Sequence, residues 1–217
     1  EVVGHQISDA LRPAVAGALA ACNHNLWLVM RAPLATLQPR HAAARALAAK
    51  VGSSCAELSE ASVLYWHGKN LDAADMATLA MLFYTGALAR VEELWLYFTR
   101  LGLAVPPSAL LDGLSCGDAP RLTVLSLHAT GLGTASAASL AAALSRGALP
   151  KLEVLFVGGN AVGDEGLAAL APALRQRPSF KWLMLLNDRI GDAGVAALLD
   201  NLGTKELKQL KTLDLRS

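Results

Sequence analysis

The stretch LEVLFVGGNAVGDEGLAALAPAL, from Leu152 to Leu174, decides the fold because its pattern returns about every thirty residues along the chain. Counted from the first leucine, apolar residues fall at offsets 0, 3, 5 and 10, and a polar residue falls at offset 8. A fixed period of this length predicts a solenoid in which each unit packs on its neighbours. Copies of the pattern start at Ala61, Val91, Leu122, Leu152, Phe180 and Leu210.

Each copy predicts a short strand followed by a turn and a helix. In Leu122 to Ala129, apolar Leu125 and Leu127 alternate with their neighbours, as a half-buried strand requires. A glycine at offset 11 permits the turn, and an oxygen-bearing side chain at offset 12 is expected to cap the helix. These caps are Thr134, Asp164 and Asp192. Proline two residues before the next copy is expected to end each helix, at Pro120, Pro150 and Pro178.

The same template extends upstream with less regularity. We expect a single array of about seven units over residues 1–217, truncated at both ends, with a first strand cut in half near Val2. An irregular enlarged unit is expected near residues 23–60. It should hold a second strand over 23–30, with Leu26 and Leu28 inward, a helix over 41–50 and a loop around 52–55.

Two of the copies carry a family resemblance. The lines LxxLxLxxNxVGDxGLxxLxxAL at Leu152 to Leu174 and FxxLxLxxDxIGDxGVxxLL at Phe180 to Leu199 resemble ribonuclease-inhibitor-type leucine-rich repeats. The resemblance implies an α/β fold, a leucine-rich-repeat solenoid shaped as a horseshoe, with a parallel concave β-sheet and convex helices. It also implies that a partner docks on the concave face.

The chain departs from that family in two respects. Only Asn160 keeps the asparagine that the family uses at offset 8 to bond neighbouring backbone, and other residues replace it at Lys69, Thr99, Thr130 and Asp188. The family's alternation of tryptophan-rich and cysteine-rich repeats is absent, so ribonuclease inhibition itself is not supported.

Side chains at offsets 2, 4 and 6 should point to the open concave side, because offsets 3 and 5 point inward. Aromatic and apolar residues dominate these columns, and large apolar patches usually mark an interface. Buried Tyr and Trp anchors can each contribute about 2 kcal/mol or more to binding. The residues assigned to partner binding are Trp27, Tyr65, His67, Glu93, Trp95, Tyr97, His128, Phe156, Trp182, Met184 and Leu186.

These features favour a non-catalytic module that binds a partner protein. The alternatives are a structural subunit of a large multi-subunit assembly, and a GTPase-activating regulator resembling the nuclear-transport GTPase activator. The apolar face could also contact another segment of the same chain, or consist of surface hydrophobes with no role. No catalytic, cofactor or metal residue is assigned: His67 and His128 are separated by about 10 Å, too far to share a metal.

Composition excludes further classes. The chain has 217 residues, 53% hydrophobic and 17% charged, with a formal net charge of +1. This balance does not indicate a nucleic-acid partner, and the apolar stretches are too short for membrane insertion. The three cysteines form no CxxC pair, so we expect an intracellular, reducing compartment such as the cytoplasm.

Overall fold

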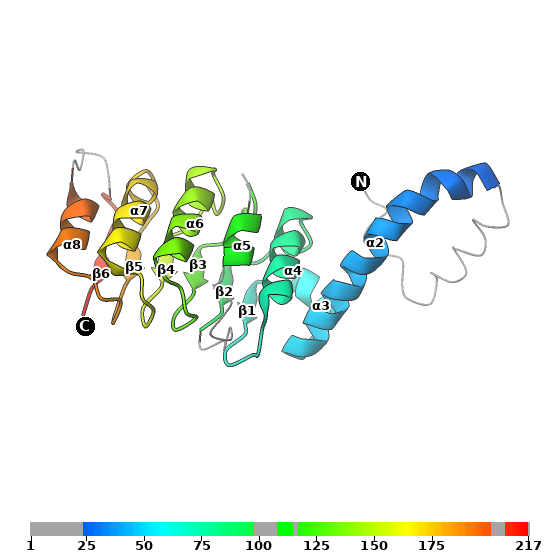
Figure 1. Cartoon of the computed structure of the whole chain (residues 1–217), viewed down its shortest axis with the longest axis horizontal. Helices are drawn as coiled ribbons and strands as arrows, with labels where there is room; N and C mark the ends of the chain where they lie inside the picture. Colours follow the sequence, from blue (N-terminus) through cyan, green and yellow to red (C-terminus); the bar gives the residue numbers. More distant parts are fainter. Residues whose placement is uncertain (1–23, 98–107, 115–116, 201–206, 217) are drawn as a thin grey trace. The chain divides into compact units, whose positions relative to one another are not determined.

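The computed structural model describes residues 24–97, 108–114, 117–200 and 207–216, and helices alternate with short strands along most of that length (Figure 1). The chain divides into two compact units, Glu1–Ala43 and Ala44–Ser217. The described strands are β1 (Val63–Tyr65), β2 (Glu93–Trp95), β3 (Val124–Ser126), β4 (Val154–Phe156), β5 (Trp182–Met184) and β6 (Thr212–Asp214). The described helices are α2 (His24–Val51), α3 (Cys55–Glu60), α4 (Ala73–Tyr84), α5 (Ser108–Gly113), α6 (Thr134–Ser145), α7 (Gly163–Arg175) and α8 (Asp192–Leu199).

The strands of the second unit form one parallel sheet. Their order in space follows their order in the chain, from β1 to β6, and each pair is in register at its central leucine, as in Leu94 beside Leu125. Figure 1 shows α4 to α8 stacked side by side along the sheet. The prediction of a parallel sheet alternating with helices is therefore confirmed.

The core lies between the sheet and the helices. Leucines at offsets 3 and 5, such as Leu94 and Leu125, are almost fully buried, as are helix residues such as Leu140 and Leu170. Burying one such side chain contributes roughly 1.5–3 kcal/mol. Because leucines at offsets 3 and 5 recur in successive units, their burial supplies most of the driving force for folding. The last turns of α2 join the same core through Leu47.

Asn160 binds the turn of the preceding repeat. Its side-chain oxygen accepts from the backbone N–H of Thr130 and Leu132, at 3.0 and 2.9 Å, and its amide donates to the carbonyl of Leu127 at 2.9 Å. One repeat later, Asp188 Oδ1 accepts from the Asn160 N–H at 2.9 Å. At Asn160 and Asp188, the side chain at offset 8 therefore links neighbouring turns.

Arginines link the helix side of neighbouring repeats. Buried Arg177, which follows α7, donates to the carbonyls of Leu144, Ala148 and Leu149 at the end of the preceding helix-turn segment; the first two distances are 2.9 and 2.6 Å. Burial lowers the pKa of this guanidinium. Arg146 donates to the carbonyl of Leu114 at 3.0 Å, also in the preceding repeat. The carbonyls after a helix end thus receive donors from the next unit.

The predicted helix caps at offset 12 are wrong in detail. The N-cap of α6 is Gly133, that of α7 is Val162 and that of α8 is Gly191, and none of them makes a side-chain cap hydrogen bond. The cap falls at or before the turn glycine, so the offset-12 residue is already helical. The Thr134 hydroxyl donates to the carbonyl of Val162 in the next repeat at 3.1 Å. Asp164 Oδ1 accepts from the Gly191 N–H at 2.6 Å. Side-chain caps with complete capping boxes occur instead at Ser54 and Asp72.

The strand predicted over residues 23–30 is also wrong, because residues 24–51 form the single helix α2. The alternation that suggested a strand rested on two leucines, whereas the run from Ala42 to Ala49 consists of strong helix formers that continue the helix. Trp27 therefore lies on α2 and not on a strand of the sheet. The helix expected over 41–50 is part of α2, and the loop around 52–55 separates α2 from α3. The half strand expected near Val2 lies outside the described residues.

Candidate functional site

The open sheet face is the set of strand side chains that point away from the core. They alternate with the buried leucines, and most remain partly exposed; Tyr65 is 58% and Trp182 is 41% exposed. Side chains that directly follow the strands extend the same rows. The large members of the open sheet face are Val63, Tyr65, His67, Glu93, Trp95, Tyr97, Val124, His128, Val154, Phe156, Trp182, Met184 and Leu186.

Five rings gather on this face and form the aromatic cluster of Tyr65, His67, Trp95, Tyr97 and Phe156. Tyr97 is central: its ring centroid lies 5.5 Å from that of Tyr65, 4.5 Å from that of His67 and 6.2 Å from that of Trp95. The Tyr65 and Tyr97 hydroxyls are hydrogen-bonded to each other. Trp95 also contacts Phe156, at 5.3 Å and an interplanar angle of 31°. Aromatic pairs in this range are mutually stabilising.

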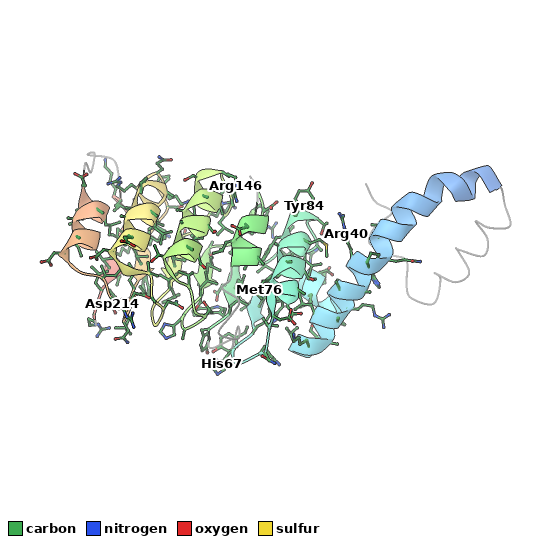
Figure 2. The ribbon with its side chains drawn as sticks, viewed as in Figure 1. Arg40, His67, Met76, Tyr84, Arg146 and Asp214 are labelled. Atoms are coloured by element: carbon green, nitrogen blue, oxygen red, sulfur yellow. The ribbon has the colours of Figure 1, made fainter. Side chains whose placement is uncertain are left out.

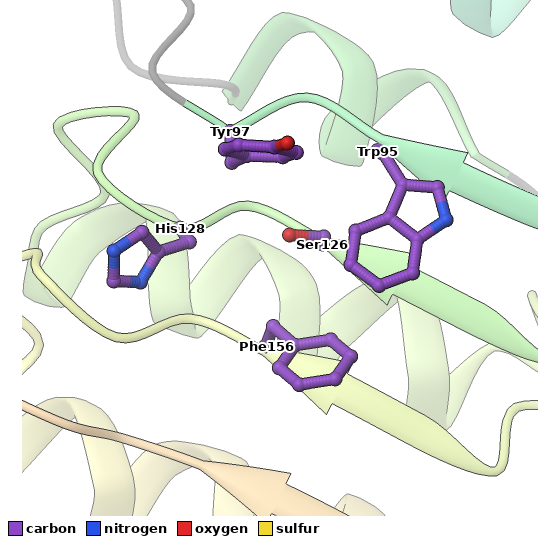
Figure 3. A pocket seen from close by; sticks show the side chains of 5 residues that line it. All are labelled: Trp95, Tyr97, Ser126, His128 and Phe156. Atoms are coloured by element: carbon purple, nitrogen blue, oxygen red, sulfur yellow. The ribbon is translucent and has the colours of Figure 1, made fainter. Parts of the chain in front are cut away.

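One end of the cluster surrounds a shallow pocket, the Ser126 pocket, lined by Trp95, Tyr97, Ser126, His128 and Phe156 (Figure 3). Its volume is about 230 Å³. Figure 3 shows Ser126 in the middle of the surrounding rings, with Trp95 and Phe156 on one side and His128 on the other. Ser126 is only 1% exposed, although it lies on the open sheet face. The arrangement is a small apolar cup with a hydroxyl at its floor.

The small size of Ser126 creates this pocket. Trp95 and Phe156 come from β2 and β4, and adjacent strands lie about 4.8 Å apart, so their backbones are separated by about 10 Å. Both rings lean over the intervening serine and meet above it. Ser126 is not among the site residues that the sequence pattern predicts. The signal was present as a single small residue between two aromatic ones in the offset-4 column.

Two glycines support His128 from below. A Cβ on Gly158 would lie 3.2 Å from His128 Nδ1, and one on Gly159 would lie 3.1 Å from His128 Cε1. Gly159 also has a φ of +72°, which side-chain-bearing residues rarely adopt. The glycine cluster that follows β4 therefore lets the backbone approach the imidazole closely, and one wall of the Ser126 pocket depends on it.

Charge near the Ser126 pocket is acidic. The Trp95 indole Nε1–H donates to Glu93 Oε2 at 2.9 Å, and none of the five lining residues is Lys, Arg, Asp or Glu. Elsewhere on the sheet, Asp214 is paired with Arg216 at 2.6 Å, and this contact lowers the pKa of Asp214. Glu93 is thus the carboxylate adjacent to the cluster.

The structure brings seven of the predicted site residues together, namely the aromatic cluster, His128 and Glu93, which is bonded to Trp95. Trp182 and Met184 on β5, and Leu186 just after it, also lie on the open sheet face, one strand beyond Phe156 on β4. Trp27 lies on α2, in the other unit. Figure 2 places Tyr84 at the far side of the view from His67; this tyrosine is 67% exposed and lies at the end of α4.

Among the described residues, no group of His, Cys, Asp and Glu could hold a metal ion. Within the same residues, no helix has both the length and the apolar character needed to cross a membrane.

A leucine-rich-repeat family model matches residues 148–171. No curated protein matches the sequence. The chain is similar to the solved tropomodulin C-terminal domain of Caenorhabditis elegans, at 13% identity over 82% of this chain and 83% of that one, with a TM-score of 0.46. It is also similar to leiomodin-1 actin-binding site 2, at 16% identity over 73% and 74%, with a TM-score of 0.42.

Likenesses at this level are no guide to function, and the matches do not distinguish a ribonuclease-inhibitor subtype. The repeat match and the sheet of consecutive parallel strands, with helix-bearing segments between them, identify the fold as an α/β leucine-rich-repeat solenoid.

Proposed function

We propose that the chain is a non-catalytic protein-interaction module that binds a partner protein through the open sheet face, with the aromatic cluster at the centre of the contact. The observation that carries this proposal is the convergence on one patch of five partly or largely exposed rings, which lie on or just after β1, β2 and β4. Tyrosine and tryptophan are the residues most enriched among binding anchors. An exposed patch of this kind usually marks an interface.

The rigidity of the cluster supports an anchoring role. Tyr97 contacts three other rings, so little side-chain freedom remains to be lost when a partner covers it. Exposed Val63 on β1 and exposed Trp182 on β5 extend the apolar surface across the sheet on the two sides of the cluster. A protein surface fits such an extended face better than a single small molecule does.

Two acidic side chains, those of Asp164 and Asp188, have structural contacts. Asp164 accepts from the Gly191 N–H, and Asp188 accepts from the Asn160 N–H. These contacts stabilise turns between repeats, which supports a module without catalysis.

The proposal is tested by quantitative affinity purification from native cells, with the chain and its variants as bait. Trp95→Ala is expected to reduce capture of the specific partner by about tenfold or more, since such anchors contribute about 2 kcal/mol. Tyr84→Ala is the matched control, because Tyr84 is exposed on α4 and not on the open sheet face. Full capture by both Trp95→Ala and Trp182→Ala would contradict the proposal.

The same experiment separates a recognition module from a structural subunit. A partner that exchanges when unlabelled chain is added supports recognition, whereas a stoichiometric partner that does not exchange supports a permanent assembly. No observation in the described part of the chain favours the GTPase-activating alternative.

A further inference from the structure

We infer that the Ser126 pocket receives one arginine side chain of the partner protein, with its guanidinium held against the surrounding aromatic rings. This inference rests on the proposed function and specifies which chemical group the partner presents. It follows from the size of the pocket, the nature of its walls, the charge beside it and the hydroxyl at its floor.

The size of the pocket indicates a single protruding side chain. Its volume of about 230 Å³ is below the roughly 300 Å³ at which pockets for drug-sized ligands begin. The pocket also opens on a sheet face that a protein surface can cover. A long side chain extending from such a surface would enter the pocket while its backbone remains above the sheet.

The walls favour a cation. Trp95, Tyr97 and Phe156 present three rings around one space, and a cation within about 6 Å of such ring centroids is attracted to their faces. Arginine is the cation found most often in this setting, because its planar guanidinium stacks on rings and is weakly hydrated. Its aliphatic stem would meanwhile lie against the apolar walls.

Glu93 adds the complementary charge. Its carboxylate accepts from the Trp95 indole N–H at 2.9 Å, which places a negative charge beside the ring that forms the largest wall. In Figure 3, the ring nitrogen of Trp95 points away from the pocket, and its six-membered ring faces Phe156. Glu93 therefore strengthens the attraction of the indole for a cation without filling the space that the cation would enter.

The floor supplies a hydrogen-bond acceptor. Ser126 is 1% exposed, and its hydroxyl makes no hydrogen bond within the part of the chain that the structure describes. A guanidinium N–H entering the pocket would donate a hydrogen bond to this hydroxyl oxygen. A purely apolar occupant would leave this hydroxyl unpaired.

The test compares two blocked tripeptides, acetyl-Gly-Arg-Gly-amide and its citrulline counterpart, which is neutral and nearly the same shape. Each is titrated into the full chain while the indole N–H resonance of Trp95, assigned by its loss in Trp95→Phe, is followed by NMR. The arginine peptide is expected to shift this resonance saturably and to bind at least about fivefold more tightly than the citrulline peptide.

Two variants and a control sharpen the result. Glu93→Gln should shrink the preference for arginine over citrulline, and Ser126→Leu should fill the pocket and remove the shift. Glu92→Gln removes the same charge from an exposed neighbouring residue and should keep the preference.

Equal affinity for the two peptides, or no shift with either, overturns the inference. If that happens while Trp95→Ala still loses the cellular partner, the proposed function stands and only the arginine assignment fails. If Trp95→Ala and Trp182→Ala keep the partner, the proposed function fails whatever the tripeptides do.

Discussion

Trp95 and Phe156 stand on strands that are not neighbours, yet their ring centroids lie 5.3 Å apart above Ser126. A contact across an intervening strand requires a small residue on that strand, so the pair and the serine form one unit. The energetic coupling of the two rings is measurable.

A double-mutant cycle of Trp95→Ala and Phe156→Ala is expected to give a coupling energy of about 0.5–1.5 kcal/mol, the range for aromatic pairs. The measurement is urea denaturation of the four proteins. A parallel cycle of Trp95→Ala with Tyr84→Ala should be additive within about 0.5 kcal/mol, because Tyr84 is on α4. Additivity in both cycles would show that the rings do not stabilise each other.

Asn160→Ala is expected to destabilise the fold by about 2–3 kcal/mol. The substitution removes hydrogen bonds to Thr130, Leu132 and Leu127, and each contributes about 1 kcal/mol. The free energy of unfolding from chemical denaturation reports the loss. Asn70→Ala, at an exposed position, should change it by no more than about 0.5 kcal/mol. Similar effects of the two substitutions would mean that the Asn160 contacts are not stabilising.

Asp188 should make stability depend on pH. Burial raises the pKa of its carboxyl to about 6, against hydrogen bonds from Asn160 and Val162 that lower it, and Oδ2 has no partner within the described structure. The folded state therefore holds a proton that the unfolded state, with a pKa of about 3.9, releases earlier. The stability from this group is fully present below about pH 4 and is lost as pH rises through 6, by up to about 3 kcal/mol.

Asp188→Asn should therefore stabilise the protein at pH 7.5 and flatten the change in unfolding free energy between pH 4.5 and 7.5. Urea denaturation at the two pH values measures this. Asp112→Asn, on the exposed side of α5, should retain the wild-type slope. An unchanged slope in Asp188→Asn would show that this carboxyl is not protonated on folding.

Gly158→Ala should disturb both stability and the pocket. The added Cβ would lie 2.9 Å from the carbonyl oxygen of Leu186, which is backbone, and 3.2 Å from His128 Nδ1. Such overpacking typically costs about 1–3 kcal/mol. The loss is measured by thermal denaturation, with the His128 ring resonances followed by NMR. Gly133→Ala meets nothing within 4 Å and should cost less than about 1 kcal/mol; equal losses would argue against the steric explanation.

The sheet could be predicted because its signal repeats. Leucine at offsets 3 and 5 returns in successive units, and a residue such as Leu125 has only one way to be buried in a parallel stack. The positions of Trp95 and Phe156 on the open sheet face followed from alternation alone. The prediction of a strand at 23–30 was wrong because two alternating leucines are a weaker signal for a strand than a long run of helix formers is for a helix.

Contacts between units were harder to predict than positions within them. Asp164 was expected to cap its own helix but accepts from Gly191 of the next repeat, since the single-unit pattern does not contain the geometry of stacking. The Ser126 pocket was missed for a related reason. The pocket exists because Ser126 is small, whereas the sequence pattern indicates a site by its large aromatic and apolar side chains.

Arg177 limits how far the chain can be truncated from its C-terminal side. Its guanidinium supplies donors to Leu144 and Ala148, so the end of α6 is completed by a residue that follows α7. A shortened version ending at Gln176 would keep all of α6 and α7 but leave those carbonyls without their arginine. A stable fragment that contains the Ser126 pocket is therefore expected to include Arg177, which lies well past Phe156, the last residue that lines the pocket.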